Sequence, residues 1–320
     1  MLHLNTKQKQ ALSACALQAS DFPNLTPHEW ILAGKAIALL KPFKQVTVKF
    51  SAWASTTADI IPSILALRLF IEKADSNDFF NGIKTTVGEM KDSISKRLAP
   101  LLTDRLLVVS TFLDPRYKNQ FQSSEINIDT INNWVYDAYL NIDNAHDSSS
   151  SSNEEQPSTT DNTGGEDAGS APFNLDDCFT ELASSSRSSD AVFSDVPTIT
   201  TSQRGRAVAR PAGNDNQAIR TTRRAVKIQS EIHDYLALPL LKNDKCPFEW
   251  WRSIGSDHKF KNLAKLARRF LSAPSSSIES ERLFSTGGNI YEPTRNRLCP
   301  KNAEMLLFLH YNLRSLNFKY

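Results

Sequence analysis

The spacing of apolar residues predicts α-helices along most of the chain. In the first clear segment, apolar side chains recur at steps of three and four residues and share one helical face: Trp30, Ala33, Ile37 and Leu40. Thr26 and Pro27 predict the start of this helix, because threonine caps free backbone N–H groups and proline suits the first helical position. Pro42 is expected to end the helix, since proline removes a backbone donor.

The following segments extend the helical pattern. Between Asp59 and Glu72 the sequence is apolar around much of a helical circumference, which is typical of a helix buried against several neighbours. Residues 84–98 mix charged and apolar positions as an amphipathic helix does. The apolar run LLVVSTFLDPRYK, at residues 106–118, fits either a strand or a helix.

Ser, Thr, Asp, Glu and Gly dominate the sequence between Asp143 and Asp195. Such a composition buries too little apolar surface to offset the entropy of ordering, so we predict a disordered linker. Within it, the patch FNLDDCFTEL at residues 173–182 has the character of a segment that folds on a partner, but we assign it to the linker.

A basic stretch follows the acidic one. Its arginines are candidate contacts for nucleic-acid phosphates: Arg204, Arg206, Arg210, Arg220, Arg223 and Arg224. Pairing with the neighbouring acidic segment and a nuclear-import signal are the alternative interpretations.

Helical periodicity returns at about Ile228 and continues toward the end of the chain. The segment PFEWWRSIG predicts a short helix ending at Gly255, and FKNLAKLARRFLSAP, at residues 260–274, predicts an amphipathic helix with a basic face. The last helix opens at Pro300 and is nearly all apolar, which indicates burial inside the fold or against another chain. The candidate dimerisation residues are Trp250, Trp251, Phe284, Met305, Leu306 and Leu309.

Composition and charge narrow the class of protein. The chain has 320 residues, of which 40% are hydrophobic and 22% charged, which fits a soluble globular protein of about two domains. Four separated cysteines without CxxC spacing predict neither a zinc site nor a disulfide framework, so we expect no metal ligand set. The first residues lack a secretory pattern, and the apolar windows are too short to cross a bilayer, so we expect no membrane partner.

The carboxy-terminal motifs resemble those of hAT-family transposases. The sequence SSSIESERLFSTGGNIYEPTRNRLCPKNAEMLLFLHYNL, which follows EWW and a basic helix, is similar to the hAT C-terminal dimerisation region. The residues that carry this motif are Ser280, Glu281, Arg282, Phe284, Arg297 and Leu298. Upstream, LTPHEWILAGKAIALLKPFKQVT and LLVVSTFLDPRYK resemble helical segments of transposase-derived proteins that have a BED-type zinc finger.

The resemblance implies a specific chemistry for complete members of the family. An RNase H-like fold cleaves DNA and transfers strands with divalent metal, such as Mg²⁺, held by two aspartates and one glutamate. Glu281 matches the family glutamate. Asp59 and Asp114 are the available aspartates, but we interpret Asp114, which precedes Pro115, as a helix cap or turn. No complete triad emerges, so no cofactor is expected unless an active transposase is reconstituted.

The same motif has a structural interpretation. Ser276 and Glu279 have the spacing of a capping box, and a carboxylate near a helix start is favoured by the helix dipole. Gly287 and Gly288 are then expected to end that helix. Cys299 takes the capping position before the last helix.

We therefore predict a mainly α protein in three parts. Residues 1–140 form a helical domain resembling the hAT insertion region, and residues 141–227 form the linker. Residues 228–320 form the dimerisation domain, with the remnant of an RNase H-like α/β fold. The predicted function is a catalytically inactive, transposase-derived nuclear protein that dimerises with itself or with another hAT-domain protein and has DNA as a candidate partner. The alternative is a fragment of an active DNA transposase that lacks its zinc finger and two aspartates.

Overall fold

The computed structural model describes residues 25–121, 126–145, 172–185, 215–255, 258–290 and 298–313. Every regular element within these ranges is a helix, and the one β contact among them is an isolated antiparallel bridge between Thr56 and Pro274. The mainly α class is thus confirmed. The described ranges hold no strand, so the RNase H-like α/β remnant stays a prediction.

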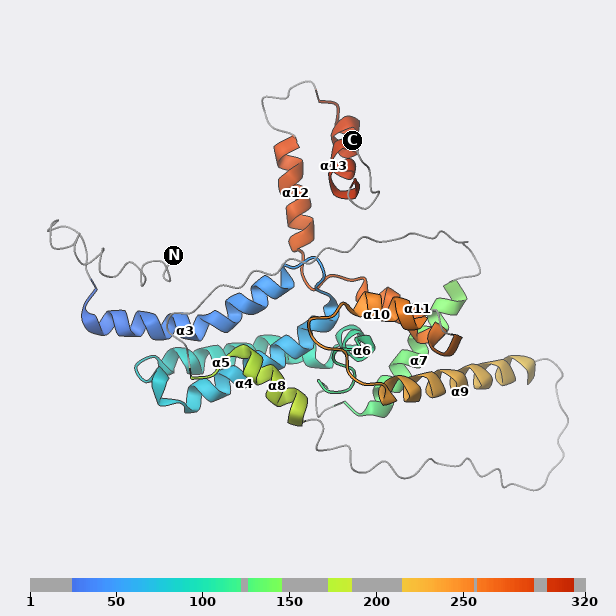
Figure 1. Cartoon of the computed structure of the whole chain (residues 1–320), viewed down its shortest axis with the longest axis horizontal. Coiled ribbons are helices and arrows are strands. Elements are labelled where there is room, and N and C mark those ends of the chain that lie inside the picture. Colours follow the sequence, from blue (N-terminus) through green and yellow to red (C-terminus); the bar gives the residue numbers. More distant parts are fainter. Residues whose placement is uncertain are drawn as a thin grey trace.

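Three long helices form one side of the body (Figure 1). They are α3 (Pro27–Phe50), α4 (Ile60–Ser76) and α5 (Lys84–Leu98), joined by the short 3₁₀ helices η1 (Thr57–Asp59) and η2 (Asp78–Phe80). The helix α4 supplies the centre of their shared core, as its apolar circumference predicts.

The predicted start of α3 is confirmed, but its predicted end is wrong. The Glu29 N–H donates to Thr26 Oγ1 at 3.3 Å, and the Glu29 carboxylate accepts from the Thr26 N–H at 2.7 Å, which completes a capping box. The helix continues through Pro42 to Phe50. Proline removes only one donor, and Leu39 and Val46 on either side of it are buried in the same core, so packing outweighs the lost hydrogen bond.

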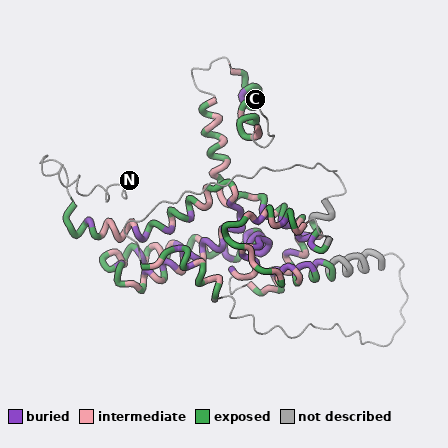
Figure 2. Tube along the Cα trace, viewed as in Figure 1, coloured by how far each residue is buried: buried purple, intermediate pink, exposed green. Residues whose placement is uncertain are grey.

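A second core surrounds α6 (Arg105–Leu113), whose residues from Leu107 onward are all buried. The helices packed around it are α7 (Ile128–Ala145), α9 (Asp215–Ala237), α10 (Pro247–Gly255) and α11 (Lys261–Leu271). Figure 2 shows α6 end-on as a buried coil at the middle of the body. Burial on all sides explains why its sequence is continuously apolar and fits two kinds of element.

This second core draws on both ends of the sequence. Its buried residues include Ile61, Phe112 and Val135 as well as Tyr235 and Leu263. The division at residues 140 and 228 stays a prediction, but the helical parts on either side of it share one hydrophobic cluster.

The assignment of residues 173–182 to a disordered linker is wrong. They belong to the start of α8 (Leu175–Ser185) and the turn before it, and α8 packs on α4 (Figure 1). Leu175 and Cys178 are buried, and Lys73 pairs with Glu181 at the edge of the contact. The apolar residues of the patch share one helical face, which α4 covers.

Lys118, the last residue of LDPRYK, connects the segment after α6 to the end of α9. Lys118 is buried with φ 47°, in the left-handed region, and its Nζ donates to the carbonyls of Tyr235 at 2.7 Å and Leu238 at 2.5 Å. These carbonyls lie at the carboxy end of α9, where free acceptors and the helix dipole favour a donor.

We expect this lysine to make stability rise between pH 8 and pH 9.5. Burial lowers the pKa of Lys118 to about 8, so between this pH and the higher pKa of the unfolded chain, the unfolded state binds more protons. A neutral amine still has two donors for the two carbonyls. Over this range, the free energy of unfolding relative to a Lys118→Met variant should rise by about 1–2 kcal/mol in urea titrations. A constant or falling difference would contradict this expectation.

Candidate dimer interface

A helical hairpin projects from the body at the carboxy-terminal end of the described chain (Figure 1). It consists of α12 (Ile278–Ile290) and α13 (Pro300–Asn312), which pack on each other. Thr286 Oγ1 and the Tyr311 hydroxyl lie 3.1 Å apart and link the two helices. The start of α13 is as predicted, with Cys299 at the N-cap position and no side-chain hydrogen bond there.

The hairpin leaves its apolar side chains largely uncovered. Ala303 is the only described residue of the two helices that is buried. Phe284 is 75% exposed and Phe308 is 62% exposed. The other large apolar side chains exposed on the hairpin are Met305, Leu306, Leu309 and Tyr311. The described fold therefore does not bury this apolar surface.

The base of the hairpin is fixed to the segment that follows α3. Ser276 Oγ donates to the Phe50 carbonyl at 2.9 Å, and Ser275 Oγ lies 2.7 Å from Ser55 Oγ. Arg282, from the Ser-Glu-Arg motif, donates to the Ser51 carbonyl at 2.8 Å. The motif arginine thus orients α12 on the body.

Two details of the structural interpretation of this motif need correction. Ser276 bonds to Phe50 rather than capping the helix, and Ser277, immediately before α12, donates to Glu281 at 3.0 Å. Gly287 and Gly288 do not end α12, which continues to Ile290. A Cβ at either glycine would meet open space, so no turn or close approach requires glycine there.

Trp250 and Trp251 belong to the core and not to the exposed interface surface. Trp251 is buried, its indole N–H donates to the Leu113 carbonyl at 2.9 Å, and its ring stacks on Tyr235. Trp250 is partly buried against the same cluster. Within this chain the pair thus contributes to packing, and its assignment to dimerisation stays a prediction.

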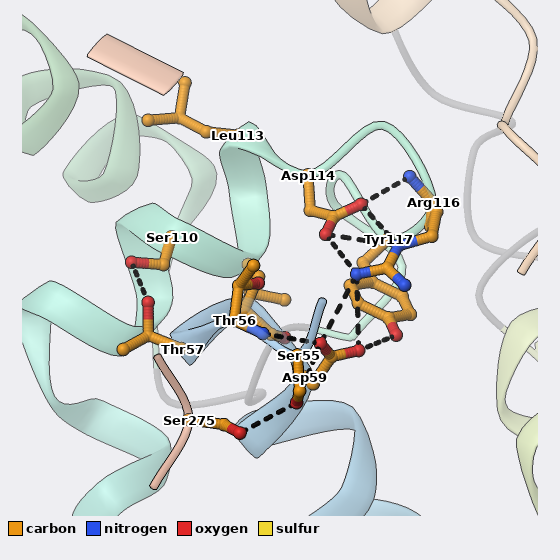
Figure 3. A network of polar contacts seen from close by, with 12 residues as sticks. Ser55, Thr56, Thr57, Asp59, Ser110, Leu113, Asp114, Arg116, Tyr117 and Ser275 are labelled. Carbon is orange, nitrogen blue, oxygen red and sulfur yellow. Dashed lines mark hydrogen bonds and ion pairs between the residues drawn. The ribbon is translucent and has the colours of Figure 1, made fainter. Parts of the chain in front are cut away.

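Asp59 and Asp114 lie together in a buried ion cluster (Figure 3). Arg116 Nη2 lies 2.7 Å from Asp114 Oδ2 and 3.3 Å from Asp59 Oδ1, so one guanidinium serves both carboxylates. Asp59 also accepts from the Tyr117 hydroxyl at 2.5 Å and pairs with Lys49 Nζ at 3.2 Å. The backbone N–H of Arg116 donates to Asp114 Oδ1 at 2.9 Å, so Asp114 forms the expected turn.

The electrostatics of this cluster follow from burial and pairing. Burial by itself favours a neutral Asp59, but the charges of Lys49 and Arg116 lower the pKa of this carboxyl below its ordinary value. For Asp114, burial outweighs the bonds from Arg116 and raises the pKa. Burial likewise raises the pKa of Tyr117 well above its ordinary value, so Tyr117 stays a donor. The charges of Lys49 and Arg116 balance those of the two carboxylates, and both carboxylates already have partners within the cluster.

The structure does not join these aspartates to Glu281. Glu281 is exposed on α12, where its carboxylate accepts a hydrogen bond from Ser277 Oγ. Among the residues that the structure describes, no group of three His, Cys, Asp or Glu side chains could hold a metal ion. Within the same ranges, no helix has the length and hydropathy needed to cross a bilayer.

The remaining candidate residues are only partly described. Arg204, Arg206, Arg210 and Arg297 lie outside the described ranges, while Arg220, Arg223 and Arg224 fall within α9. Ser280 is exposed on α12, and Leu298 is partly buried just before α13. The basic face predicted for residues 260–274 is confirmed, because four cations of α11 are exposed: Lys261, Lys265, Arg268 and Arg269.

Sequence reasoning missed two features of this region. It did not single out Trp53, which lies at the base of the hairpin and is 75% exposed. It also gave no role to Lys49, Arg116 and Tyr117 around the aspartates. For the ion cluster, the acidic and basic residues within LDPRYK were the available signal. Nothing in the sequence around Trp53 distinguishes an exposed from a buried tryptophan.

Comparisons with known proteins agree with these motifs. Residues 231–313 match the hAT family C-terminal dimerisation region. The chain is 23% identical over 320 residues to zinc finger BED domain-containing protein 4 of Homo sapiens, covering 100% of this chain and 23% of that protein. It is 22% identical over 305 residues to zinc finger BED domain-containing protein 6 of Mus musculus, covering 92% and 28%.

A shorter match concerns a transposase. Over 81 residues, the chain is 36% identical to a protein of Zea mays described as an AC transposase, which covers 24% of this chain and 10% of that protein. The chain spans about a quarter of the length of the BED-domain relatives. Residues 231–313 of this chain thus contain a match to the hAT family C-terminal dimerisation region, and the chain is similar to zinc finger BED domain-containing proteins and, over 81 residues, to an AC transposase.

Proposed function

We propose that this chain is an association subunit that forms a homodimer through the outer face of the α12–α13 hairpin. The main support for this proposal is that the hairpin lies inside the matched dimerisation region and exposes Phe284, Phe308 and their apolar neighbours. Covering such side chains is favourable by about 25 cal/mol per Å² of apolar surface. A second copy carries the same surface, as a two-fold dimer requires.

We also propose that these described residues do not cleave DNA by themselves. Asp59 and Asp114 are neutralised by Arg116 and Lys49, so neither is free to bind a divalent ion. The alternative, part of an active transposase, requires other protein segments to place two further carboxylates beside Glu281. Metal-dependent cleavage of DNA by this chain alone would contradict the proposal.

Sedimentation equilibrium of the chain tests the dimer directly. The expected result is a mass of two chains at micromolar concentration that falls toward one chain on dilution. A mass of one chain throughout the micromolar range would exclude the homodimer. Mixing with a second hAT-domain protein would then show whether the surface prefers a different partner.

A second candidate function is association with nucleic acid through α11, which also motivates the proposed nuclear location. Four exposed cations follow one side of this helix, opposite the buried Leu263 and Leu266. Cations on one face can neutralise several phosphates of one duplex.

The salt dependence of DNA binding tests this second function. A Lys265→Ala, Arg268→Ala variant should lower the slope of log affinity against log salt by about 2, since each phosphate contact contributes about 0.9. The matched control is Lys96→Ala, Arg97→Ala on α5, which removes two other exposed cations. Equal affinities and slopes for all three proteins would rule out α11 as the contact.

A further inference from the structure

The exposed apolar surface of the hairpin can contribute to an interface of ordinary size. At roughly 150–250 Å² for a fully exposed aromatic side chain, its six exposed apolar residues present on the order of 600 Å². A standard interface buries about 800 Å² on each partner, counting polar and apolar atoms together. Surface beside the hairpin that is also apolar would therefore extend the same interface.

An apolar groove lies on the body at the base of the hairpin. It has a volume of about 340 Å³ and runs between α3, α4, the end of α5 and the start of α12. Its partly or largely exposed apolar lining consists of Phe43, Phe50, Ile60, Leu98, Leu101 and Ile278. Ile278 is the first residue of α12, so the groove is continuous with the hairpin surface.

Trp53 is the most exposed large apolar side chain outside the hairpin, among the residues that the structure describes. It lies between two residues that contact the hairpin base, because the Ser51 carbonyl accepts from Arg282 and Ser55 Oγ meets Ser275 Oγ. Only two residues separate it from Phe50 in the groove lining. An indole and an apolar groove therefore both lie at the base of the hairpin.

We propose that, in the dimer, Trp53 of each copy inserts into the apolar groove of the other. This rests on the proposed dimerisation and names its second contact. In the proposed dimer the two-fold axis runs parallel to the hairpins, which brings the two bases face to face, and the symmetry repeats each insertion. Apart from Ser276 and Ile278, the residues that line the groove lie outside the matched region 231–313. The helical body thus takes part in the interface together with the hairpin.

The first test measures the dimer dissociation constant of the full chain by sedimentation equilibrium. Trp53→Ala should raise this constant by at least about 30-fold, as the loss of a buried tryptophan anchor does. The matched control is Ile31→Ala, on the far half of α3 and 57% exposed, which should change the constant by less than about twofold. A constant for Trp53→Ala equal to that of the control overturns the proposal.

The second test fills the groove from its own side. Thr47 is exposed and lines the groove, so the indole of Thr47→Trp would occupy it and weaken the dimer as Trp53→Ala does. The control Lys44→Trp adds the same side chain to an exposed position of α3 outside the lining and should leave the constant unchanged. In the double variant the two effects should not add, because both remove one contact. Full additivity contradicts the proposed pairing.

These outcomes separate the inference from the proposed function. If the unsubstituted chain stays monomeric, both the proposed homodimer and the proposed groove contact are excluded. If Phe308→Asp dissociates the dimer but Trp53→Ala and Thr47→Trp leave it intact, the proposed hairpin dimer is supported. Only the proposed groove contact is then excluded. Tryptophan emission gives an independent readout. The emission of Trp53, obtained by subtracting the spectrum of Trp53→Phe from that of the unsubstituted chain, should shift to the blue on dimerisation. A Trp53 emission that does not change with protein concentration contradicts the insertion.

Discussion

Replacement of Arg116 by methionine is expected to lower the free energy of unfolding by about 3–5 kcal/mol. The side chain of Arg116 is 9% exposed and pairs with two carboxylates that are themselves buried. Its removal leaves Asp114 without its main partner, while Asp59 keeps the ion pair with Lys49 and the hydrogen bond from Tyr117. Urea denaturation at pH 7 measures the loss. The deficit should shrink as the pH falls, since a protonated Asp114 needs no cation.

The control for this prediction is Arg105→Met. Arg105 pairs with Asp137 at 3.4 Å, and about half of each side chain is exposed, so its loss is expected to be at most about 1 kcal/mol. The two variants make the same chemical change in a buried and in an exposed ion pair. Equal losses would show that the buried cluster has no special stabilising role.

Phe308→Asp is expected to weaken the dimer at least about 100-fold, because each symmetric interface contains this position twice. The side chain is 62% exposed in the single chain, so its replacement leaves the monomer fold intact. In the dimer the new carboxylate would be buried against an apolar surface without a partner. Sedimentation equilibrium measures the change in mass, and circular dichroism verifies the helical content.

Ile31→Asp provides the matched control for the hairpin variant. Ile31 is 57% exposed on α3, away from the hairpin, and receives the same carboxylate. This variant should retain the dimer. If Phe308→Asp retains it equally well, then α13 is not part of the interface.

Much of the helical content could be predicted from the sequence, because amphipathic spacing follows directly from burial on one side. The end of α10 at Gly255, the amphipathic character of α11 and the helix start at Thr26 are local features, and the structure confirms them. The end of α3 could not be predicted, since Pro42 is a helix breaker in isolation and continuation of the helix depends on distant core partners. The helix α8 was missed for the same reason: α4 provides the surface that holds it.

The candidate interface was only partly predictable. Apolar residues in the last helix indicated burial somewhere, and the family motif indicated dimerisation, but Trp251 and Phe308 are equally apolar in the sequence. Tertiary packing places Trp251 beside Tyr235 in the core and leaves Phe308 exposed. The role of Asp59 depended on Arg116, a partner 57 residues away that no local pattern indicates.

The contacts of the short segment from Phe112 to Lys118 bear on how the protein responds to cleavage of its chain. Its backbone and side chains bond to α9, to α10 and to Asp59, and thereby join residues early and late in the sequence. The covalent connection through residues 146–214 is then secondary to this non-covalent one. A chain cut once between α8 and α9 would be expected to remain a single folded particle, and its two pieces, produced separately, should reassemble.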